Sequence, residues 1–181
     1  MFTRPSARSL LLLCLLLATP LLSMAAEPIA EKPSRSPIRS TDRRLRSLLE
    51  EGLRTSPTLR ALVARLHASD VVVYLQCDGP GAPDGRLTFL STAGGYRYVV
   101  VRMGRFSRMQ QIAMMAHELQ HAVEIADTPA IVDGPSLVRE YKQIGYVNQR
   151  SNLPGVAFDT QAAVRAGEQV LKELMLEDVS Y

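Results

Sequence analysis

The residues His117, Glu118 and His121 have the types and the spacing that metal-dependent hydrolysis requires. Two histidines four positions apart lie about 40° apart on one face of an α-helix, so both imidazoles can point at one ion. Glu118 lies about 100° further round from His117, where its carboxylate can take a proton from an attacking water molecule. The pattern therefore predicts a Zn²⁺ site with His117 and His121 as ligands and Glu118 as the general base.

A metal-free core helix is the competing interpretation of the same stretch. The neighbours Met114, Met115 and Val123 are apolar and fit a buried helix with or without a metal. A buried helix does not explain why a glutamate stands between the two histidines. The metal site explains both observations, and we therefore favour it.

With these neighbours, the stretch His117-Glu118-Leu119-Gln120-His121 resembles the active-site helix of the zincin metallopeptidases. The resemblance covers roughly residues 94–145, which contain an expected strand, the motif helix and a downstream helix. It implies that the two histidines and a third protein ligand hold zinc and that the glutamate is the general base. It also implies that an extended peptide binds along the edge of a sheet.

The third zinc ligand is assigned to Glu140 from the resemblance to thermolysin-like gluzincins, which use a glutamate about twenty residues beyond the second histidine. Glu140 lies 19 positions after His121. Its surroundings, "REYKQIG", lack the Asn-Glu-x-x-x-Asp pattern of that group. The residue shares an inward stripe of the predicted helix, where an unpaired carboxylate is costly and a metal would remove the cost. The other members of the stripe are Leu137, Tyr141 and Ile144.

Other residues remain alternatives for the third ligand. Glu124 lies near the histidine face but one turn beyond His121, which suits a partner for an imidazole N–H better than a ligand. Asp133 lies in the following loop, and His67 is expected at the end of a helix as a cap. Asp127 is directed about 80° away from the first histidine if the helix continues, and we therefore exclude it.

Residues 1–26 have the layout of a secretory signal peptide. Arg4 and Arg8 precede an apolar run at residues 10–22, and small residues follow, with cleavage expected after Ala25 or Ala26. The run is short for a membrane span, and no second one follows it. The sequence thus predicts a secreted or periplasmic protein without a membrane span after signal cleavage; a retained N-terminal anchor is the alternative.

The composition after cleavage limits the classes of partner. Loss of Arg4 and Arg8 leaves 19 basic against 18 acidic residues, which gives no electrostatic reason to bind nucleic acid or an anionic membrane. Cys77 is then the remaining cysteine, so no intrachain disulfide can form, and it is expected as a buried thiol. The fold must therefore be held by its core, with a metal as a further source of stability.

The domain organisation follows from composition and periodicity. Residues 27–41 are rich in proline, serine and charge and are expected to be a disordered linker. Residues 42–181 are expected to form a single zincin-like domain of the α+β class, with a small antiparallel sheet of about three strands packed against the motif helix and further helices. Strands are expected at 70–77, 86–91 and 96–103, and helices at 41–55, 57–67, from 107, at 136–145 and at 159–176.

These expectations define a small secreted zinc-dependent metallopeptidase that hydrolyses a peptide or protein substrate. The alternative is a zinc-binding but non-catalytic domain of the cell envelope that binds peptide or wall. A metal-free helical and β domain is the third interpretation. The sequence does not predict the cleavage preference or the oligomeric state.

Overall fold

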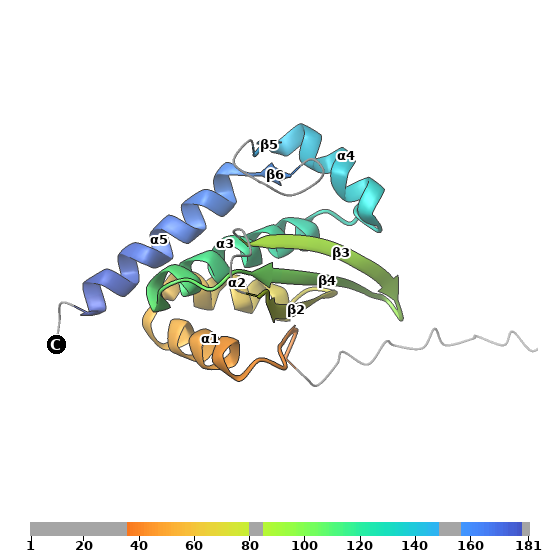
Figure 1. Ribbon diagram of the computed structural model, residues 1–181. Helices are drawn as coiled ribbons and strands as arrows, with labels where there is room; N and C mark the ends of the chain where they lie inside the picture. The colour runs from red at the N-terminus through yellow and green to blue at the C-terminus, as the bar shows by residue number, and fades with distance from the viewer. Residues whose placement is uncertain (1–35, 80–84, 149–156, 179–181) are drawn as a thin grey trace, which may run out of the picture.

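The computed structural model describes residues 36–79, 85–148 and 157–178. In these residues the chain forms five helices, a four-stranded sheet and a separate two-stranded sheet (Figure 1). The protein is therefore of the α+β class, as the sequence predicts. The predicted signal peptide lies outside the described residues.

Local capping residues determine where the first two helices begin. The Asp42 carboxylate accepts hydrogen bonds from the first backbone N–H groups of α1 (Arg43–Thr55). The Ser56 hydroxyl accepts one from Leu59 in α2 (Pro57–His67), whose first residue is a proline. α2 begins at the predicted residue, and α1 begins two residues into its predicted range.

The four-stranded sheet has the order β1-β2-β4-β3. Its strands are β1 (Ile38–Arg39), β2 (Val71–Cys77), β3 (Arg86–Ala93) and β4 (Tyr96–Met103). β3 and β4 are antiparallel, as predicted for these strands, and Gly94 and Gly95 at the turn of this hairpin have φ angles of 58° and 77°. Such positive angles are readily adopted by glycine, which explains the two glycines there.

The prediction of a purely antiparallel sheet is wrong, because β2 pairs with both β1 and β4 in parallel. β4 lies between β2 and β3, so consecutive strands along the chain are not all neighbours in the sheet. Nearly unbroken apolar runs are typical of parallel strands that are covered on both faces. The runs Val71–Val73 and Val99–Val101, all buried, carry this signal.

The last residues of the segment predicted as a disordered linker, residues 27–41, form part of the fold. Ile38 is buried, and residues 38 and 39 pair with Val73 and Tyr74 of β2. Apolar burial and a parallel ladder therefore order the end of the segment predicted as a linker. Most of that segment lies outside the described residues.

A long helix, α3 (Arg108–Asp127), lies between the four-stranded sheet and α5 (Gln161–Asp178), the last helix of the chain. α3 packs against β2, β3 and β4 on one side and along α5 on another (Figure 1). α4 (Gly134–Ile144) and the two short strands β5 (Tyr146–Val147) and β6 (Phe158–Asp159) connect α3 to α5. Eleven residues of α3 are buried, which makes it the core helix.

A buried arginine fixes the end of α3 against the sheet. The Arg97 guanidinium of β4 is bound by the Asp70 carboxylate and donates hydrogen bonds to four backbone carbonyls at and beyond the end of the helix. These carbonyls belong to Ile125, Ala126, Thr128 and Ile131. Carbonyls at a helix end lack partners within the helix, so one buried cation satisfies several of them.

None of the helices within the described ranges combines the length and the apolar character needed to cross a membrane.

Candidate metal centre

The core helix α3 brings the two histidines of the motif together. The ring centroids of His117 and His121 are 5.0 Å apart, with an angle of 81° between the ring planes. The His121 side chain is 6% exposed and that of His117 is 19% exposed. The centre is therefore reached from solvent at the His117 side.

Asp159, the last residue of β6, supplies a carboxylate to the two imidazoles. Its Oδ1 lies 3.3 Å from His117 Nε2 and 3.7 Å from His121 Nε2. The same oxygen accepts a hydrogen bond from the backbone N–H of Thr160, which fixes its direction. One ligand atom from each of the three side chains can be chosen so that all lie within 4.8 Å of one another.

These three residues could hold a metal ion. Zinc bonds of about 2.0–2.2 Å in a tetrahedral arrangement place the ligand atoms roughly 3–4 Å apart, and both histidine–carboxylate distances fall in that range. Three protein ligands leave one position of a tetrahedral ion open, as in catalytic rather than structural zinc sites. The donor set and its spacing thus fit a divalent ion that prefers nitrogen and oxygen ligands.

A buried hydrogen-bond network holds His121 from behind. Glu124 Oε2 lies 2.9 Å from His121 Nδ1 and accepts a hydrogen bond of 2.8 Å from the Tyr141 hydroxyl. Glu124 Oε1 accepts a bond of 2.6 Å from the Thr160 hydroxyl. The prediction that Glu124 is a partner of an imidazole nitrogen is confirmed, and this contact leaves Nε2 of His121 directed at Asp159.

The ionisation of these groups follows from their contacts. Burial lowers the pKa of His117, but the Asp159 carboxylate, with Glu118 and Glu124, outweighs it and raises this pKa above the ordinary value. Burial opposes ionisation of Asp159, yet its hydrogen bond to His117 holds the pKa of that carboxyl below the ordinary value. The site without metal therefore favours an imidazolium–carboxylate pair.

The pKa values of Glu124 and Tyr141 are shifted in the direction that stabilises the hydrogen-bond network around His121. Burial would raise the pKa of Glu124, but its contacts with His121 and two hydroxyls lower it. Burial, together with the charge of Glu124, raises the pKa of the Tyr141 phenol. Tyr141 therefore remains a neutral donor that orients Glu124.

Glu118 is buried against the beginning of β3. Glu118 is only 2% exposed, and its carboxylate lies close enough to His117 to raise the pKa of that imidazole. A Cβ atom at Gly85 would lie 2.5 Å from Glu118 Oε1 and 2.9 Å from Met114 Sδ. A side chain at residue 85 would therefore have to displace the Glu118 carboxylate or the Met114 sulfur.

Glu140, the third ligand predicted from the sequence, is not the carboxylate that lies beside the two histidines. The structure brings together His117, His121 and Asp159, and Glu140 does not belong to this group. Tyr141, not Glu140, is the residue of α4 that reaches the centre, and neighbouring residues on a helix are directed about 100° apart. Glu140 is consequently half-exposed on another face of α4.

The alternative ligands are also placed elsewhere. Asp133 caps the beginning of α4 through the backbone N–H of Ser136, and His67 is the last residue of α2. Asp127 forms an ion pair with Arg65, because α3 continues straight through it. Its exclusion as a ligand is consistent with this placement.

Asp159 and Thr160 were assigned from the sequence only to the beginning of the last helix. An aspartate followed by a threonine before a helix is typical of a cap, and the Thr160 hydroxyl does accept from the Ala163 N–H. Nothing in their spacing from His121 indicates a ligand, because β6 is brought to α3 by tertiary packing alone. The apolar run at residues 156–158 that precedes this pair is the local sign in the sequence that the segment turns inward.

Comparison with known proteins does not assign the chain to a group: no family model, no curated protein and no solved structure matches it.

Proposed function

We propose that the protein is a zinc-dependent peptidase whose metal is held by His117, His121 and Asp159, with Glu118 as general base. The observation that carries the proposal is the group of three ligand atoms, one of which belongs to the residue next to the buried Glu118 on α3. A divalent ion bound there would polarise the substrate carbonyl and lower the pKa of a water molecule.

The residues of the chain then perform the proton transfers. Glu118 accepts a proton from the attacking water, whose oxygen adds to the peptide carbonyl carbon. When the carbon–nitrogen bond breaks, Glu118 returns that proton to the leaving nitrogen. Glu124 and Tyr141 keep the His121 ring fixed during both transfers, because they hold its Nδ1 side.

An extended peptide is the substrate that the surrounding fold favours. β3 is the edge strand of the four-stranded sheet, and its beginning lies over Glu118. A peptide paired with the edge of β3 that no described strand occupies would pass the same carboxylate. Together with the predicted signal peptide, this suits a secreted or periplasmic enzyme acting on peptides or proteins.

A non-catalytic zinc-binding domain is the second candidate. The burial of Glu118, which is 2% exposed, favours it, because a general base must reach a water molecule. In that case the ion would fix β6 and α5 to α3, and the edge of β3 would bind a peptide without cleaving it.

The substitution Glu118→Gln separates the two candidates. The protein lacking the predicted signal peptide is loaded with zinc and incubated with an internally quenched peptide library, and cleavage is followed by fluorescence and mass spectrometry. We expect turnover by the wild type and a loss of at least about 10²-fold in the variant, with one zinc per chain in both. Equal turnover in the two proteins would exclude Glu118 as the base, and zinc binding without any turnover would favour the second candidate.

A further inference from the structure

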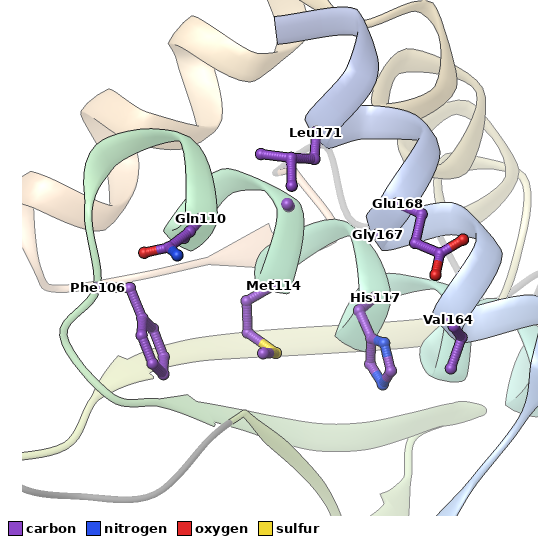
Figure 2. A pocket seen from close by; sticks show the side chains of 9 residues that line it. Phe106, Gln110, Met114, His117, Val164, Gly167, Glu168 and Leu171 are labelled. Atoms are coloured by element: carbon purple, nitrogen blue, oxygen red, sulfur yellow. The ribbon is translucent and has the colours of Figure 1, made fainter. Parts of the chain in front are cut away.

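A hollow of about 330 Å³ lies between α3 and α5 and has the candidate ligand His117 as part of its wall. Figure 2 shows Phe106 and Gln110 toward one end and His117, Val164 and Glu168 toward the other. Its volume is at the lower end of the range for ligand pockets, so it has room for a single large side chain. We call this hollow the α3–α5 groove.

Helix geometry gives the groove its length and its depth. Its residues on α3 extend from Gln110 to His117, about two turns, or roughly 10 Å along the helix. A Cβ atom at Gly167 would lie 3.2 Å from the Ala113 carbonyl oxygen and 3.3 Å from His117 Cβ. The small residues Ala113 and Gly167 therefore let the two helices approach each other, and the hollow remains between their larger neighbours.

The walls of the groove are apolar surface that the core does not use. Phe106, Val164 and Leu171 are half-buried, and they lie outside the hydrophobic cluster formed by the described residues. Met114 joins them from α3 and connects the groove to that cluster. Apolar walls of a concave site that do not contribute to the core are suited to a ligand.

We propose that the α3–α5 groove receives a large apolar side chain of the peptide substrate, aliphatic or aromatic, next to the bond that is cleaved. The inference rests on the proposed peptidase function. His117 connects the two sites, because its ring faces Asp159 through Nε2 and also lines the groove. A peptide bound at the candidate metal centre would therefore have a neighbouring side chain close to the groove, because His117 belongs to both.

The charge of the groove adds a second element of selectivity. Glu168 contributes a carboxylate to its lining, and among the described residues that line the groove there is no lysine or arginine. An acidic side chain of the substrate is repelled there and would lose its hydration on apolar walls. The groove therefore selects against aspartate and glutamate as well as for apolar residues.

A series of peptide substrates, together with a variant that fills the groove, tests the proposal. Peptides of one scaffold carry Leu, Phe, Ala or Asp at each position in turn, and kcat/KM is measured with the zinc-loaded protein. We expect Leu and Phe to exceed Ala by about tenfold or more at one position beside the cleaved bond, with Asp lowest. Leu171→Trp, which fills the groove, should remove this preference, whereas Leu176→Trp on the exposed part of the same helix should keep it.

The charge contribution has its own variant pair. Glu168→Lys should raise kcat/KM for the Asp peptide relative to the Ala peptide, and the matched exposed change Glu177→Lys should leave that ratio unaltered. Cleavage without a preference for large apolar residues, or a preference unaffected by Leu171→Trp, would overturn the assignment of the groove.

A binding measurement distinguishes failure of the groove from failure of the peptidase function. The zinc-loaded Glu118→Gln protein is titrated with fluorescently labelled Leu and Ala peptides, and anisotropy gives the Kd. Tighter binding of the Leu peptide that is lost on adding Leu171→Trp supports the groove even if the wild type cleaves nothing, in which case the peptidase proposal alone fails. Equal binding of both peptides rejects the groove.

Discussion

The Asp159 carboxylate lies 3.3 Å from His117 Nε2 and 3.7 Å from His121 Nε2. The candidate centre therefore depends on this residue. Its own fixation comes from the Thr160 backbone N–H, while the Thr160 hydroxyl binds Glu124. Glu124 in turn holds His121. The two elements that carry ligands are therefore joined by hydrogen bonds before any ion binds, and an ion would find the site largely preformed.

If Asp159 and not Glu140 is the third ligand, substitution of these two residues should affect zinc affinity differently. Asp159→Asn should weaken zinc binding by more than about 100-fold, because even partners of a ligand cost 10–100-fold when removed. Glu140→Gln should leave zinc affinity within about threefold, because Glu140 lies outside the ligand group. Competition with a chelating dye gives both dissociation constants. A large loss in Glu140→Gln with none in Asp159→Asn would restore the ligand predicted from the sequence.

Protons should compete with the metal at the same centre. The pKa of His117 is raised above its ordinary value of 6.5 in the metal-free site, and a histidine must be neutral to bind a metal. Zinc affinity should therefore fall as the pH decreases from about 8 to 6, starting above pH 6.5. Calorimetric titrations in two buffers of different ionisation enthalpy should show proton release on binding at pH 7. Affinity that is independent of pH would contradict the paired state of His117 and Asp159.

Among the secondary-structure elements, α3 and β3 meet at the point where proton transfer is proposed. α3 presents Glu118, and the glycine that covers it, Gly85, immediately precedes β3. Met114 lies under the same glycine and also lines the α3–α5 groove. The beginning of β3 thus limits how the base and one wall of the groove can move.

Gly85→Ala should reduce turnover by at least about 10²-fold, because a methyl group 2.5 Å from Glu118 Oε1 must displace the carboxylate or the strand. Zinc affinity should change little, since the three ligands are elsewhere. Gly79→Ala is the matched control, because a Cβ atom there would meet no atom within 4 Å. Comparable turnover in both variants would indicate that Glu118 is not held beneath residue 85 during catalysis.

The local sequence predicts the helices and the hairpin better than it predicts what they bring together. The starts of α1 and α2 follow from Asp42 and from Ser56-Pro57, which act within a few residues of the chain. The direction of β2 relative to β4 and the contact of Asp159 with His117 depend on packing between segments far apart in sequence. A carboxylate at a helix start carries the same local signal whether it caps the helix or binds a metal, and so Asp159 could not be distinguished from a cap.

The whole domain should be more stable with its metal than without it. The ligands come from the middle of α3 and from the β6–α5 junction, so a bound ion links the core helix to the last helix of the chain. No intrachain disulfide is expected in the mature protein to make such a link, because Cys77 is then its one cysteine. An ion that binds the native state alone stabilises it by about 2.7 kcal/mol at 100 times its Kd.

For a domain of this size, that stabilisation should raise the Tm by about 5–10 °C in calorimetry when zinc is added to the metal-free protein. Asp159→Asn should show a much smaller rise, because the link to β6 is lost while both histidines remain. Hydrogen exchange should locate the effect, with amide protection increasing most at residues 158–163. If the Tm is unchanged after a chelator has removed the zinc, and the removal is verified by elemental analysis, the ion contributes nothing to holding α5 on α3.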